Sequence, residues 1–244
     1  MGHEYMFDGG VMAKSLFSLG FWQRPWEAQG KIPFQEIGYF QADLFDPPKW
    51  KPSFPNIAFE LMDDSDAYWG AKIVTSFTNE LIKKLAEAGE YRRPEATRYV
   101  EDVLLRRRDA IGRYWLNRIT PLEDLKLTAG ESGIQFRDLA AERGYADARS
   151  RRFRFWFADV NGKKFTQEQI VEPGAPSEIS LSGLRDILAK TKSAPIDKFR
   201  RTVVVRLFIQ SNQSAGQWAL PIEVFLGHTD DLRLQVLGWH HAPR

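Results

Sequence analysis

The chain of 244 residues contains no cysteine, and this absence removes three kinds of chemistry at once. Without a thiol there is no disulfide bond, no thiolate zinc site and no cysteine nucleophile. Long apolar runs are also missing, because the short patch Leu16–Trp22 is broken by Ser18 and Gly20. The sequence therefore predicts no membrane span. It leaves the compartment unknown, cytoplasmic if Met1 is the true start.

An excess of either charge is absent too. The 34 lysines and arginines nearly balance the 32 aspartates and glutamates, for a formal net charge of +2, so the composition predicts no nucleic-acid partner. Apolar residues are plentiful, since hydrophobic residues make up 43% of the chain and aromatic residues 13%. This content predicts a folded chain that buries bulky side chains rather than a disordered one.

Motifs that hold phosphate, metal or a reacting acyl group are not found. Gly9-Gly10 is not followed by the Gly-Lys-Ser/Thr of a phosphate loop, and no G-x-G-x-x-G or G-x-S-x-G run occurs. The histidines lack zinc-ligand spacing and stand at His3, His228, His240 and His241. The sequence predicts no cofactor and no metal site. It leaves enzymatic activity uncertain, with none expected from this chain alone.

Apolar spacing near four residues dominates the first half. The first sixty residues are rich in aromatics, proline and glycine, which favours loops around one short helix near Val11–Leu19. Helices are then predicted after Asp63, after a cap at Thr78, and from Pro94 to about Asn117. Their expected apolar faces are Trp69, Ile73 and Phe77; Leu81, Ile82 and Leu85; and Tyr99, Val100, Val103, Leu104, Ile111, Tyr114 and Trp115.

After Leu127 the spacing changes to two. The run Arg152–Phe157 alternates, and Asn161-Gly162 is a strong hairpin signal. Further strands are expected at Thr202–Gln210, Leu220–Leu226 and Leu232–Leu237, and a helix at Ser182–Lys190. The sequence therefore predicts an α+β fold: a helical region with an aromatic, Pro-rich opening at 1–126, then an antiparallel β-sandwich-like domain at 127–244.

Three carboxylates, Asp63, Asp64 and Asp66, form the first candidate site. Such a cluster could bind a metal or act as a general acid/base pair. Its spacing matches no calcium loop, whereas capping of the following helix accounts for all three residues. Asp64 and Asp66 are kept as candidate ligand-binding residues.

Arg107 is the second candidate, because it lies four residues after Val103 and four before Ile111, on the face expected to point inward. Its neighbours Arg106 and Arg108 point in other directions on a helix, so the three do not form one phosphate-binding patch. A structural ion pair or a snorkelling side chain is the simpler role, and ligand binding is the alternative.

Trp22 and Trp50, together with Trp26, are the third candidate. They stand in Pro-rich stretches and could form a platform on which a sugar or a peptide stacks. The alternative is that each ring pins a loop to the core.

Four groups of segments carry a resemblance. They are Gly2–Asp8, Phe45–Pro47 with Trp50–Pro52, Asp66–Val74, and Arg107–Asp109 with Gly112–Trp115. Together they resemble the C-terminal part of a family of larger, uncharacterised bacterial proteins with a kinase-like segment, containing a D-F-G run, directly upstream. The resemblance covers roughly residues 1–140 and the β domain only loosely. It implies that Met1 is internal or starts a truncated copy. It also implies that the kinase-like segment's metal-binding aspartate is missing, so no kinase activity follows.

Three functional hypotheses remain. The leading one is a non-catalytic C-terminal portion of a kinase-like protein, a helical support plus a β module. Its partner is the upstream kinase-like segment or another protein, and without that partner an apolar patch is left exposed. The first alternative is a peptide- or glycan-binding β-sandwich module. The second is an enzyme that uses Asp64 and Arg107.

Overall fold

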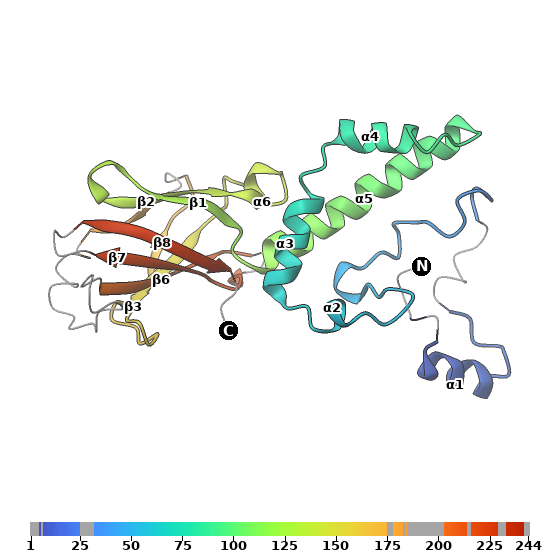
Figure 1. Cartoon of the computed structure of the whole chain (residues 1–244), viewed down its shortest axis with the longest axis horizontal. Helices are drawn as coiled ribbons and strands as arrows, with labels where there is room; N and C mark the ends of the chain where they lie inside the picture. Colours follow the sequence, from blue (N-terminus) through green and yellow to red (C-terminus); the bar gives the residue numbers. More distant parts are fainter. Residues whose placement is uncertain are drawn as a thin grey trace. The chain divides into compact units, whose positions relative to one another are not determined.

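A computed structural model describes residues 5, 7–24, 32–174, 178–182, 184, 203–213, 216–228 and 233–241 (Figure 1). It has the α+β fold expected: the longer helices end by Arg118, and the described strands follow it together with two short helical turns. The chain divides into two compact units, which we call the helical unit (1–66 and 70–114) and the β unit (67–69 and 115–244). The division falls before the first strand, so the strand at Leu122–Leu127 belongs to the β unit and not to the region expected at 1–126.

Capping side chains set where several helices begin. Asp8 accepts N–H bonds from Gly10 and Val11, and the predicted cap Thr78 accepts one from Leu81 at 3.2 Å. Pro94 starts the longest helix as its first residue, where a missing N–H costs nothing. The helices are α1 (Gly9–Phe17), η1 (Pro47–Lys49), α2 (Ile57–Glu60), α3 (Asp64–Val74), α4 (Asn79–Glu87) and α5 (Pro94–Arg118).

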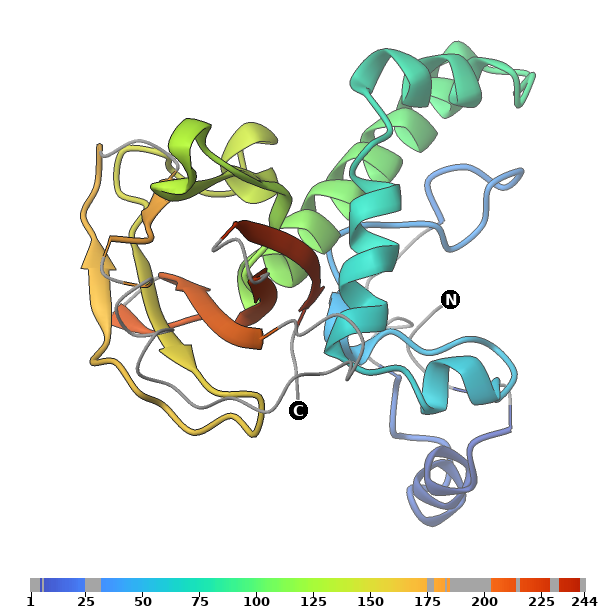
Figure 2. The same cartoon turned by 60° about the vertical axis from the view of Figure 1, so that its left-hand side comes forward.

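Two antiparallel sheets make up the β unit. One has the strand order β1-β2-β5, and the other has the order β4-β3-β6-β7-β8. They can be followed in Figure 1 and, from another side, in Figure 2. The elements are β1 (Leu122–Leu127), η2 (Ala129–Glu131), β2 (Gly133–Asp138), α6 (Leu139–Glu142), β3 (Phe153–Ala158), β4 (Gln169–Val171), β5 (Glu178–Ser180), β6 (Val203–Ser211), β7 (Ile222–His228) and β8 (Leu234–His241).

The core of the β unit lies between these sheets. Alternate residues of each strand point to the same side of a sheet, and the inward set is almost wholly apolar. The five-stranded sheet contributes Phe153, Phe155, Phe157, Val205, Leu207, Ile209, Ile222, Val224 and Leu226, and the three-stranded sheet contributes Leu122, Leu125, Ile134, Phe136 and Ile179. This one contiguous cluster is the sandwich-like arrangement that the period of two predicted.

Local backbone features confirm the hairpin signal and add one irregularity. Gly162 has φ +83°, a left-handed conformation that glycine adopts without strain, in the turn that Asp159 closes by accepting the Gly162 N–H at 2.9 Å. Between β7 and β8 the register shifts, because Phe225 faces Gly238 and Leu226 faces Val236, which leaves Leu237 as the extra residue of a bulge. The helix expected at Ser182–Lys190 lies largely outside the described residues.

Candidate functional site

The acidic cluster is the start of α3. Asp63 accepts N–H bonds from Ser65 at 2.9 Å and Asp66 at 3.0 Å, and Asp66 accepts one from the Asp63 backbone at 3.2 Å. This capping box satisfies donors that the first turn leaves without helical partners. Asp64 lies in the same turn, where negative charge is favourable. Across the described part of the chain, no group of three or more His, Asp or Glu is arranged to hold a metal ion.

Arg107 fastens the aromatic opening of the chain to α5. Its Nε and Nη2 donate to the Gln41 carbonyl at 2.8 and 2.5 Å. Its guanidinium also lies 4.6 Å from the ring centre of Phe40 and 4.9 Å from that of Phe45. Burial lowers the pKa of Arg107, although an arginine in a protein stays charged. The structure thus gives Arg107 a structural role, with a carbonyl and two rings in the place expected for a carboxylate.

The two candidate tryptophans each have a local neighbour. Lys14 Nζ lies 6.0 Å from the ring centre of Trp22. Trp50 packs at a tilt against Phe59, with ring centres 5.1 Å apart, and is 37% exposed. Trp26 lies outside the described residues. The neighbours of Trp22 and Trp50 differ from each other and from those of the acidic cluster and Arg107, so the structure supports the loop-pinning interpretation more than a shared platform.

A buried polar cluster in the β unit escaped the sequence analysis. Tyr68 donates to Glu123 Oε1 at 2.6 Å, its ring stacks on His241 with centres 4.2 Å apart, and His241 Nε2 lies 3.0 Å from the Leu122 carbonyl oxygen. Burial, reinforced by the hydrogen bond to Glu123, raises the pKa of Tyr68 far above its usual range. The residues are distant in sequence, and the bulge at Leu237 interrupts the alternation of the last strand, so no local pattern indicated a buried His241. The cluster fastens Tyr68 to β1 and β8.

The sequence analysis also missed a buried ion pair, because its two residues are not close in the sequence. Arg151 Nε donates to Asp138 Oδ2 at 2.6 Å, and the two side chains are only 6% and 5% exposed. Arg151 also donates to the Asn212 carbonyl at 2.8 Å, and Asp138 caps α6 by accepting from Ala140 and Ala141. The pair therefore joins three segments of the β unit. The guanidinium of Arg151 and the carboxylate of Asp138 are bound to each other.

The outer face of the five-stranded sheet combines rings with cations. Trp156 and Phe208 are cross-strand neighbours whose rings are 8° from parallel, with centres 5.3 Å apart. Lys164 lies 4.2 Å from the Trp156 ring centre, and Arg206 lies 5.2 Å from that of Phe208. The carboxylates paired with these cations are Glu168 with Lys164 and Glu223 with Arg206. A sugar platform needs an open ring face, and here each ring already has a cation over it.

The helical unit keeps its large apolar side chains outside. Of the 23 large hydrophobic side chains exposed among the described residues, 18 belong to the helical unit and 5 to the β unit. The buried hydrophobic residues of the helical unit are Ala71, Ile82, Ala86, Ala96, Val100 and Val103. Of the expected apolar faces, Ile73 is 61% exposed, Leu81 43% and Leu85 50%. The helices thus bury three alanines together with Ile82, Val100 and Val103, which were expected inside, and leave other bulky residues exposed.

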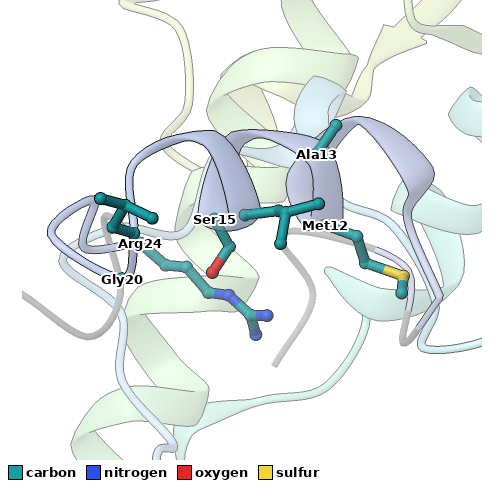
Figure 3. A pocket seen from close by; sticks show the side chains of 7 residues that line it. Met12, Ala13, Ser15, Gly20 and Arg24 are labelled. Carbon is teal, nitrogen blue, oxygen red and sulfur yellow. The ribbon is translucent and has the colours of Figure 1, made fainter.

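A shallow hollow lies beside α1. It has a volume of about 610 Å³ and is lined by Met12, Ala13, Ser15, Leu16, Leu19, Gly20 and Arg24. Figure 3 shows the side chains of Met12 and Arg24 on the same side of the helix. All lining residues come from one short stretch of chain, so the hollow is a local surface feature and not a cleft with converging catalytic groups.

Comparison with known proteins finds no family model, curated protein or solved structure that matches this chain. Among the described helices, none is both long and apolar enough to cross a bilayer.

Proposed function

We propose that this chain is a non-catalytic accessory portion of a larger kinase-like protein. In this proposal the helical unit docks its exposed apolar side chains onto the kinase-like segment or a partner protein, and the β unit is a folded appended module. The observation that carries the proposal is the contrast between the two units: the β unit encloses its large apolar residues in one core, whereas the helical unit exposes them.

Four residues define the docking surface most clearly, and we call them the exposed stripe: Ile73, Phe77, Leu81 and Leu85. Ile73 lies in α3, Phe77 in the connection that follows, and Leu81 and Leu85 in α4, and the four side chains are between 37% and 61% exposed. Fully burying one such side chain contributes about 1.5–3 kcal/mol, so the part still exposed on all four is worth several kcal/mol to a partner that covers it. Leu81 and Leu85 lie one turn apart on α4, the spacing of apolar residues that anchor a helix in a hydrophobic groove.

A peptide-binding module is the second candidate, and one observation favours it. Strand β8 lies at the edge of the five-stranded sheet and exposes 49% of Leu237 and 38% of Trp239. An edge strand with apolar side chains can accept an added peptide strand. The covered rings of Trp156 and Phe208 favour a peptide over a glycan as the ligand of this unit.

The first experiment measures association in solution. We expect the chain alone to self-associate as its concentration rises, because the exposed stripe finds no other cover. Size-exclusion chromatography with light scattering measures the mass, and Leu81→Ser/Leu85→Ser should shift it toward the monomer. Val160→Ser is the matched control, since Val160 is 39% exposed in the β unit. A clean monomer at every concentration contradicts the proposal.

The second experiment tests the kinase-like partner. The proposal predicts an open frame encoding a D-F-G run directly upstream of the codon for Met1. Because the chain has no cysteine, a single Leu81→Cys variant reports on that position alone when labelled with a maleimide. Labelling should be several-fold slower in the longer protein than in this chain, while a Val160→Cys control labels equally in both. Equal labelling at Leu81→Cys would refute docking through the exposed stripe.

A further inference from the structure

The chain contains one asparagine that is followed by glycine, at Asn161-Gly162 in the turn after β3. Asparagine is among the residues most prone to spontaneous chemical damage. The damage begins when the backbone nitrogen of the next residue attacks the side-chain amide carbon, and glycine leaves that nitrogen open because it has no Cβ. Bulkier residues follow the other asparagines, which are Asn56, Asn79, Asn117 and Asn212.

Both reacting groups of this pair are accessible to water. Asn161 and Gly162 are exposed, and within the described part of the chain no hydrogen bond to the side-chain amide of Asn161 is found. The amide carbon is therefore open to attack and is not covered by packing. Water also reaches this position, and the second half of the reaction consumes it.

The attacking nitrogen is the group that the fold restrains. The Gly162 N–H donates to the Asp159 carbonyl oxygen at 2.9 Å, and the Asp159 N–H donates to the Lys163 carbonyl oxygen at 3.0 Å. Before it attacks, the Gly162 nitrogen must give up its proton and approach the Asn161 side chain. A hydrogen bond from this N–H to Asp159 opposes both changes.

The carboxylate of Asp159 closes the same turn a second time. Its Oδ1 accepts the N–H of Asn161 and the N–H of Lys163, each at 2.9 Å. These two bonds hold the residues on either side of Gly162, so the turn opens freely only when they break. One half-buried aspartate thus restrains the backbone before and after the reactive nitrogen.

We propose that Asn161 is a site of spontaneous deamidation, and that Asp159 slows the reaction by keeping the Gly162 nitrogen bound in the turn. The Gly162 nitrogen forms a bond to the side-chain carbon of Asn161, and the amide nitrogen leaves as ammonia with the proton that Gly162 gives up. Water then opens the resulting succinimide ring at either carbonyl, which leaves aspartate or isoaspartate. The isoaspartate product adds a carbon to the main chain of the turn, so the bonds to Asp159 no longer fit.

Incubation of the purified chain at mildly alkaline pH tests the proposal, because base removes the proton from the attacking nitrogen. Mass spectrometry of a peptide digest detects the change of amide to carboxylate at each asparagine. We expect this change at Asn161, and none at the other asparagines over the same time. In urea, where the turn is open, the rate at Asn161 should rise at least about tenfold.

A pair of variants tests the role of Asp159. Asp159→Ala should raise the rate at Asn161 in the folded chain at least about fivefold, because it removes two hydrogen bonds that hold the turn. Asp147→Ala is the matched control, since Asp147 also accepts the N–H of the second residue after it, Arg149 at 3.0 Å, and this variant should leave the rate unchanged. Circular dichroism checks that both variants stay folded, and the comparison in urea needs no variant.

Three results would overturn the proposal. If Asn161 does not change even in urea, it is not a reactive site. If the folded and unfolded chains react at the same rate, the turn gives no protection. If Asp159→Ala reacts no faster than Asp147→Ala, the carboxylate of Asp159 has no part in the protection. None of these results bears on the exposed stripe, so this proposal and the proposed function fail separately.

Discussion

Removing Arg151 should destabilise the β unit more than almost any other single change of a charged residue. Arg151→Met keeps most of the side-chain stem but leaves the Asp138 carboxylate buried without its cation, and the Asn212 carbonyl without a donor. Leaving one partner of a buried pair uncompensated costs about 3–5 kcal/mol. Since small domains are stable by only about 5–15 kcal/mol, this is a large fraction of the total.

Urea unfolding followed by circular dichroism measures that cost. Arg149→Met is the matched control, because the Arg149 side chain is 93% exposed and water screens its contact with Asp147. The double variant Asp138→Leu/Arg151→Met leaves neither charge, so it should recover most of the loss. What remains is about 1 kcal/mol for the lost α6 cap and the cost of the Asn212 carbonyl that has lost its donor. If Arg151→Met costs no more than the control, the reasoning about this pair is wrong.

Two further predictions concern Tyr68 and Arg107. Folding raises the pKa of Tyr68. The free energy of unfolding of the wild type should therefore fall as the pH rises above the ordinary tyrosine pKa of 10.0, by up to about 1.4 kcal/mol per pH unit. Tyr68→Phe should lower the free energy of unfolding by about 1–2 kcal/mol near neutral pH. The difference in this free energy between wild type and variant should narrow when urea unfolding is repeated at rising alkaline pH. A difference that stays constant with pH contradicts the prediction. Arg107→Gln should speed chymotrypsin cleavage near Phe40 and Phe45, whereas Arg98→Gln, an exposed control, should not.

Local patterns in the sequence predicted much of the fold, because local physics decides those features. The cap at Thr78, the helix start at Pro94 and the Asn161-Gly162 turn each depend on a few neighbouring residues. The sequence predicted strand β3 because apolar residues alternate with other residues along it. Strand β1 did not, because its run Leu-Glu-Asp-Leu-Lys-Leu is largely polar and Glu123 is buried through a distant tyrosine.

The size of the apolar residues on a helix did not indicate which of its faces is buried. Ile73 and Leu81 belonged to the expected apolar faces but are exposed, whereas Ala71 and Ala86 are buried. Ile82 is buried as expected. A small residue allows closer packing, and its burial depends on what lies opposite, which one sequence does not state. The candidate sites show the same difference between local and distant contacts. Helix capping by the acidic cluster is local and was predicted. The clusters of Tyr68 and Arg151 unite residues far apart in the chain and were not predicted.

The bulge at Leu237 changes which residues of β8 share a face. Val236 pairs with Leu226 and His241 pairs with Ile222, and both partners lie in the core of the β unit. Paired residues of neighbouring strands point to the same side of the sheet, so Val236 and His241 face the same way although they are five residues apart. In a regular strand an odd spacing would put them on opposite faces. The extra residue therefore lets one strand present Val236 to the apolar core and His241 to the ring of Tyr68.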